Sequence, residues 1–233
     1  MRALIAAALA RLWPAGNGDV LLALGYATPY LAPYLGQASP LAACMPAQQG
    51  AVYFPQGADN ISLLAHDSEL PFAESSANRV LLVHSVENSE QLSWMIQEIW
   101  RVLTPGGRVL AVVPNRFSLW SRSSASPFGY GRPFSMAQLR DLLTGHQFSL
   151  TRSGTALFMP PIRLRWLWKA APKLEKFCVA LCDALGCHLG GVLLIEAEKQ
   201  LYSPIRQPVV EGRHYRAAMA ARAAMSIEFP PTA

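Results

Sequence analysis

Two short segments carry histidines and carboxylates that could do chemistry. One is His66-Asp67-Ser68-Glu69, and the other holds His84 and Glu87. A histidine titrates near neutral pH, so His84 could act as a general base or orient a substrate. The alternative is a structural histidine that caps the end of a strand. Asn115 is a second candidate catalytic residue with the same two interpretations.

The stretch "LLALGYATPY", Leu21–Tyr30, has the pattern of a buried strand that runs into a turn. A phosphate or nucleotide loop at such a turn is normally rich in glycine. Only Gly25 is present here. The turn is therefore either an altered ligand loop or a loop that no longer binds.

Three of the four cysteines lie close together in "CVALCDALGCH", beside His188, and the fourth is Cys44. A metal or iron–sulfur site is one interpretation. Cys178 and Cys182 are one helical turn apart, however, and the rest of the chain has no second ligand pair. We favour small core side chains on a helix, and expect no metal.

The composition fits one sizeable α/β domain. Hydrophobic residues make up 52% of the 233 residues and charged residues 15%, which argues against disorder. The net charge of +5 suggests an acidic partner or surface. The opening "MRALIAAALARL" could be a secretory signal, but Arg11 and Trp13 stand where a small-residue cleavage site belongs. We expect an amphipathic lead-in helix, no membrane span and a cytoplasmic protein.

Apolar runs and helical periodicity alternate along the chain. A helix over 90–103 should end at "TPGG", and Ser135 should cap a helix over 135–146. Such alternation predicts a parallel sheet covered by helices on both faces, with ligands outside the carboxyl ends of its strands. Strands are expected at 19–25, 40–46, 61–66, 78–86, 108–115, 148–158 and 190–202.

We predict one domain over residues 1–202 and a tail over 203–233. A basic, aromatic insertion at about 160–189 contains "RLRWLWK". It suits a protein interface or an acidic membrane surface; nucleic acid is the less favoured partner. The alternative is a cap helix over the substrate pocket with solvated arginines.

"ELPFAESSANRVLLVHSVEN", followed by "LSWMIQEIWRVLTPGGRVLAVVPN", resembles the class I S-adenosylmethionine (SAM)-dependent methyltransferases of the type 11 group. The resemblance covers about Asp19–Phe148, and Gly190–Tyr202 suits the family's last strand. It implies a Rossmann-like, seven-stranded, mostly parallel sheet with an antiparallel last strand. The variant "GYATPYL" loop looks like an alphaproteobacterial subgroup. That likeness hints at a glyoxalase II-type hydrolase as a partner.

The resemblance also implies SAM as cofactor and an unidentified methyl acceptor. The family's three loop glycines correspond to Gly25, Ala27 and Pro29, and its ribose-binding carboxylate to Met45. Between Asp19 and Asp59 there is no charged residue. Losing a charge-assisted hydrogen bond of about 1.5–3 kcal/mol weakens binding by roughly one to two orders of magnitude, unless Gln48 or Gln49 substitutes. The cofactor-binding positions that the resemblance implies are Gly25, Tyr26, Ala27, Thr28, Met45, Asp67, Ser68, His84 and Ser85.

Pro29 can also be explained without a ligand, because Thr28-Pro29 is a good start for a helix. Tyr26 would place a ring where the cofactor passes. Asp67 could receive the adenine amino group or belong to a solvated turn. Two hypotheses remain: a methyltransferase with a degenerate cofactor loop, and a catalytically inactive protein of the same fold that binds or regulates another protein.

Overall fold

The computed structural model describes residues 1–14, 18–38, 40–47, 50–121, 131–158, 174–175, 177–182 and 189–201. All of them belong to one compact unit, Met1–Leu201. The predicted tail lies outside the described residues, and the domain limits stay a prediction. Gln48, Gln49, Cys187, His188 and most of the basic insertion lie outside them as well.

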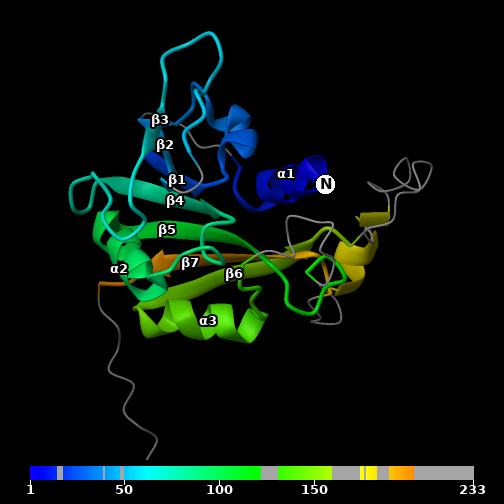
Figure 1. Cartoon of the computed structure of the whole chain (residues 1–233). Helices are drawn as coiled ribbons and strands as arrows, with labels where there is room; N and C mark the ends of the chain where they lie inside the picture. Colours follow the sequence, from blue (N-terminus) through cyan, green and yellow to red (C-terminus); the bar gives the residue numbers. More distant parts are fainter. Residues whose placement is uncertain are drawn as a thin grey trace, which may run out of the picture. The chain divides into compact units, whose positions relative to one another are not determined.

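Seven strands form a single sheet in the order β3-β2-β1-β4-β5-β7-β6 (Figure 1). Neighbouring strands are parallel from β3 to β5, whereas β7 is antiparallel to both β5 and β6. This confirms the predicted Rossmann-like, mostly parallel sheet with an antiparallel last strand. The strands are β1 (Leu21–Gly25), β2 (Leu41–Met45), β3 (Ser62–Leu64), β4 (Ala77–Val83), β5 (Leu103–Pro114), β6 (Phe148–Ala156) and β7 (Val192–Lys199).

The central strands are buried on both faces, which explains their continuous apolar sequences. Every residue of β1 is buried, with Leu21 opposite Leu41 of β2 and Arg79 of β4. A parallel strand covered on both sides has no solvent face, so its sequence shows an unbroken apolar run.

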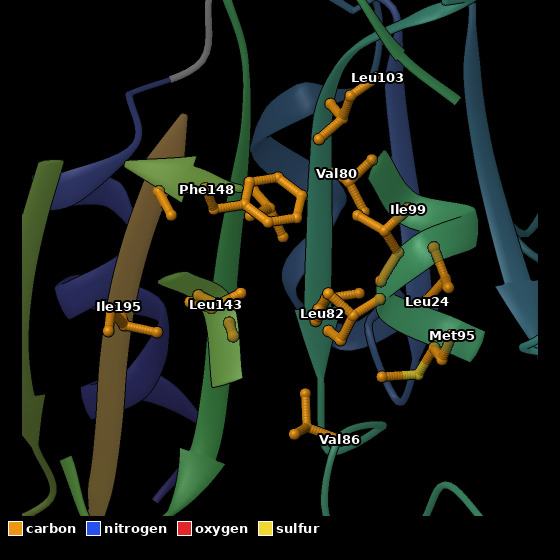
Figure 2. Close-up of a cluster of buried hydrophobic side chains, with 14 of the residues drawn as sticks. Leu24, Val80, Leu82, Val86, Met95, Ile99, Leu103, Leu143, Phe148 and Ile195 are labelled. Atoms are coloured by element: carbon orange, nitrogen blue, oxygen red, sulfur yellow. The ribbon is translucent and has the colours of Figure 1, made fainter. Parts of the chain in front are cut away.

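Two helices cover one face of the sheet. Figure 2 shows Met95 and Ile99 of α2 (Leu92–Val102) beside Val80 and Leu82 of β4. Helix α3 (Met136–Gly145) adds Leu143 to the same core. As expected, Ser135 caps α3: its side chain accepts from the Gln138 amide, and the Gln138 side chain accepts from the Ser135 amide.

The opposite face is covered differently. Helix α1 (Arg2–Leu12) confirms the expected lead-in helix. After β1 come only two three-residue 3₁₀ turns, η1 (Thr28–Tyr30) and η2 (Ala32–Tyr34), each with a proline in its first positions. Thr28-Pro29 therefore starts a helical turn, as expected, but no α-helix follows. A second proline four residues later removes another backbone donor, which stops the turn from lengthening.

The segment Leu70-Pro71-Phe72 is held against α2 by two charged side chains. Glu98 accepts from the Leu70 amide at 3.0 Å, and Arg101 donates to the carbonyls of Leu70 and Phe72 at 3.1 and 3.0 Å. Glu98 and Arg101 also pair with each other. This clasp gives the L-P-F segment a structural role. No helix in the described ranges is both long and apolar enough to cross a bilayer.

Candidate functional site

Gly25 ends β1 at the centre of the sheet, and the fold itself requires glycine there. Its φ is +80°, and a Cβ would lie 2.4 Å from the Val83 carbonyl oxygen and 2.9 Å from Cβ of Ser85. The Tyr26 amide donates to that same Val83 carbonyl at 2.8 Å. The turn after β1 is thus pressed against the end of β4, and this contact accounts for the single retained glycine without any ligand.

The next residues of the turn point in two directions. Ala27 has a φ of −90°, which needs no glycine, and its side chain is buried in the core with Thr28 beside it. Tyr26 is 54% exposed and is not among the side chains that line the cavity described below. In the structure, Tyr26 therefore does not fill that cavity.

Met45 is the last residue of β2, and its side chain contacts the segment that follows the strand. It is buried, and its sulfur accepts from the Val52 amide at 3.3 Å. A thioether is an uncharged and weak hydrogen-bond acceptor. It would therefore bind a ribose hydroxyl much more weakly than a carboxylate would.

A small cavity lies among the ends of β1, β2, β3 and β4. Its volume is about 10 Å³, and Asp67 and Ser85 supply its polar side chains among apolar ones such as Leu24, Cys44 and Leu70. Ser85 is buried, and its hydroxyl has no hydrogen-bond partner in the described part of the chain. A volume of roughly 10–15 Å³ holds one water molecule.

Asp67 and Ser68 form a local turn after β3. His66 pairs with Asp67 at 3.5 Å, and its Nδ1 lies 2.7 Å from the Ser68 hydroxyl. Asp67 and Ser85 are chemically suited to an adenine. Met45 is less suited to the ribose of the cofactor, because its thioether carries no charge.

His84 and Glu87 form a pair immediately after β4. His84 has a φ of +54°, and its Nδ1 lies 2.7 Å from Oε1 of Glu87. Asn88 donates to the His84 carbonyl at 2.8 Å, which holds this unusual backbone conformation. Because an ionised carboxylate only accepts, we assign the proton of the pair to Nδ1.

Glu87 is almost fully buried beneath the segment that begins at Gly131. The Arg132 amide donates to the Glu87 carbonyl at 3.0 Å, and a Cβ on Gly131 would lie 3.2 Å from Cγ of Glu87. Glu87 Oε2 has no hydrogen-bond partner among the residues described. A buried carboxylate that orients an imidazole is an arrangement suited to proton transfer.

Asn115 connects the end of β5 to the turn before β7. Its side-chain amide donates to the Gly190 carbonyl at 2.8 Å, and its oxygen accepts from the Phe117 amide at 3.1 Å. These contacts give Asn115 a structural role. The catalytic roles of Asn115 and His84 stay predictions. The cofactor-binding roles of the other candidate residues stay predictions as well.

Sequence reasoning missed the hydrogen bond from the Val52 amide to the Met45 sulfur. No pattern marks Val52, since it lies in a stretch without periodicity, and only the path of the chain brings it to Met45. The cysteine cluster is only partly described: Cys178 and Cys182 lie in a helical stretch, with Cys182 buried. In the ranges that the structure describes, no three histidine, cysteine or acidic side chains could hold a metal ion.

One protein-family model and several solved structures are similar to this chain. A protein-family model described as a methyltransferase domain matches residues 24–111. No curated protein matches the chain in sequence.

Solved structures share the fold at low sequence identity. An SAM-dependent methyltransferase from Thermotoga maritima has a TM-score of 0.58 at 16% identity, covering 85% of this chain and 89% of its own. A complex between the Haloferax volcanii Trm112 methyltransferase activator and a methyltransferase candidate gives 0.58 at 16%, covering 86% and 90%. An SAM-dependent methyltransferase from Mesorhizobium loti gives 0.55 at 12%, covering 83% and 96%. These solved structures show that the chain shares their fold, and the family match covers residues 24–111 of it.

Proposed function

We propose that this protein is a class I SAM-dependent methyltransferase with a degenerate cofactor crevice and an acceptor that is yet to be identified. The observation that carries the proposal is the strand order around β1. Its turn at Gly25 meets Ser85 at the carboxyl ends of the parallel strands, where ligands of such sheets bind. The methyltransferase-domain match over residues 24–111 supports the same function.

The cofactor binds weakly under this proposal. Met45, whose sulfur accepts from the Val52 amide, stands where the family has a ribose-binding carboxylate. Asp67 and Ser85 remain to contact the adenine. A missing charge-assisted hydrogen bond corresponds to an affinity loss of about 10- to 100-fold.

His84 is the proposed base in this site, with Glu87 holding its imidazole in position. Methyl transfer from a sulfonium depends mainly on in-line positioning, and a base is needed only where the acceptor is a poor nucleophile. The buried carboxylate therefore favours an acceptor that must lose a proton as it reacts.

Calorimetry with SAM and with its demethylated product tests the proposal on the full chain, with folding verified by circular dichroism. We expect saturable heat with a dissociation constant of roughly 0.1–1 mM. If folded protein gives no heat at millimolar ligand, the enzyme hypothesis is excluded and the second candidate function remains.

That second candidate is a catalytically inactive methyltransferase fold that binds another protein. Helical residues 174–175 and 177–182 present an apolar stripe to solvent: Leu174, Phe177 and Leu181 are 42%, 66% and 47% exposed. Exposed aromatic and aliphatic side chains at helical spacing are typical of interfaces. On the opposite side of the same stretch, Glu175 is buried. Its carboxylate accepts hydrogen bonds from the Leu157 and Phe158 amides.

A glyoxalase II-type hydrolase is the partner to test first. The Haloferax volcanii complex shows a similar fold paired with an activator, which lends this class of role some support. Phe177→Ser combined with Leu181→Ser should abolish co-elution with purified hydrolase, whereas Leu119→Ser, at another exposed apolar position, should not. We also propose that residues 1–202 form the domain and that the protein acts in the cytoplasm.

A further inference from the structure

A hollow of about 340 Å³ lies between helix α1 and the turns η1 and η2; we name it the α1 groove. Small-molecule sites in proteins typically measure about 300–1,000 Å³. The hollow follows from the sequence, because Pro29 and Pro33 limit the crossover after β1 to two short turns. The small side chains Ala6 and Ala10 of α1 line its other wall.

Buried hydrogen bonds fix the two walls of the α1 groove. The Tyr34 hydroxyl of η2 donates to the Trp13 carbonyl at 2.7 Å. The Trp13 indole donates to the buried Glu196 carboxylate of β7 at 2.9 Å. Helix α1 is therefore tied both to η2 and to the sheet, so the groove does not depend on a loosely packed helix.

One polar side chain opens into this apolar hollow without using its hydrogen-bonding capacity. Tyr30 lines the groove and is only 6% exposed, and its hydroxyl makes no hydrogen bond within the described part of the chain. Burial and, to a smaller extent, nearby Tyr26 raise the pKa of Tyr30 to about 12, against the opposing effect of Arg2. The hydroxyl is therefore a protonated donor at neutral pH.

Positive charge stands at the same groove. Arg2 contributes to the lining, and no acidic side chain is among the described residues that do so. A donor and a cation around an otherwise apolar hollow are complementary to a ligand with an anionic head and an apolar body.

We propose that the α1 groove binds a small apolar carboxylate, with the carboxylate held by Arg2 and the Tyr30 hydroxyl and the apolar body between Ala6, Ala10 and Pro29. The volume suits a chain of roughly eight carbons or one aromatic ring system. This site is distinct from the crevice at Asp67 and Ser85, and it does not depend on SAM binding.

Sodium octanoate, titrated into the full chain by calorimetry, is the probe, and octanol is its neutral counterpart. We expect one saturable site for octanoate. Tyr30→Phe should weaken octanoate binding about 10-fold and Arg2→Gln about 3- to 10-fold, with little change for octanol. Arg11→Gln removes the same charge from an exposed position of α1 outside the lining, so it should leave octanoate affinity unchanged.

Ala10→Trp is the blocking variant. Ala10 is exposed and lines the groove, so a large side chain there fills the hollow without disturbing the core. It should abolish octanoate binding while the far-ultraviolet circular dichroism stays unchanged. Octanoate binding that survives Arg2→Gln, Tyr30→Phe and Ala10→Trp, or no saturable binding up to about 10 mM, would overturn the proposal.

Discussion

The Val52 amide donates to the Met45 sulfur at 3.3 Å, at the position where the resemblance places a ribose-binding carboxylate. Met45 is buried and uncharged, and it is not among the side chains that line the small cavity of about 10 Å³.

Met45→Asp together with Pro29→Gly should tighten binding of the demethylated cofactor about 10- to 100-fold, since a carboxylate replaces the thioether. The exposed ring of Tyr26 leaves room for this gain. Calorimetry measures it. Met45→Leu with Pro29→Gly is the matched control, because it removes the sulfur without adding a carboxylate and should give no comparable gain. A folded Met45→Asp variant with unchanged affinity would contradict the assigned position.

Gly25→Ala should destabilise the fold by roughly 2–4 kcal/mol, because the added Cβ collides with the Val83 carbonyl and the backbone has a positive φ. Urea unfolding measures the free energy. Gly36→Ala is the control: Gly36 has a similar φ of +77° but open space around it, so only about 1 kcal/mol should be lost. Equal losses would show that the contact with β4 is unimportant.

His84 and Glu87 should be energetically coupled. A double-mutant cycle with His84→Ala and Glu87→Gln should give a coupling free energy of about 1–3 kcal/mol, as expected for a hydrogen bond to a buried charged group. Urea unfolding of the four proteins at neutral pH supplies the values. Additivity within about 0.5 kcal/mol would mean that the two side chains do not interact as described.

Glu98 should make stability depend on pH in the acidic range. Its hydrogen bonds with Arg101 and then with the Leu70 amide lower the pKa of its carboxyl below 4.5 in the folded protein, against the opposing effect of burial. A lowered folded pKa stabilises the protein above the unfolded pKa, and this stabilisation is lost as the pH falls through the folded pKa.

Glu98→Gln should therefore be less stable than the wild type at pH 7, and the difference should shrink as the pH drops below about 4.5. Urea unfolding at several pH values measures this. Glu90→Gln, at an exposed position just before α2, should show no such trend. A difference that stays constant down to pH 3 would exclude the carboxylate as its source.

The sequence by itself determined the secondary structure and the retained glycine. Apolar runs mark β1 and β4, a helical apolar face marks α2, and Ser135 marks the start of α3. These signals are local, since each depends on residues within a few positions of one another. The resemblance supplied the seven-stranded, mostly parallel sheet with an antiparallel last strand, which the structure confirms.

Tertiary structure decided what the Met45 side chain contacts and where else a ligand could bind. The Met45–Val52 contact depends on the path of a segment without periodicity, and the α1 groove depends on a hydrogen bond between Trp13 and Glu196, which are 183 positions apart. Cavity volume is set by how side chains from distant segments pack together. A pattern of residue types carries no information on that packing, so the sequence alone indicated neither the small cavity at the strand ends nor the α1 groove.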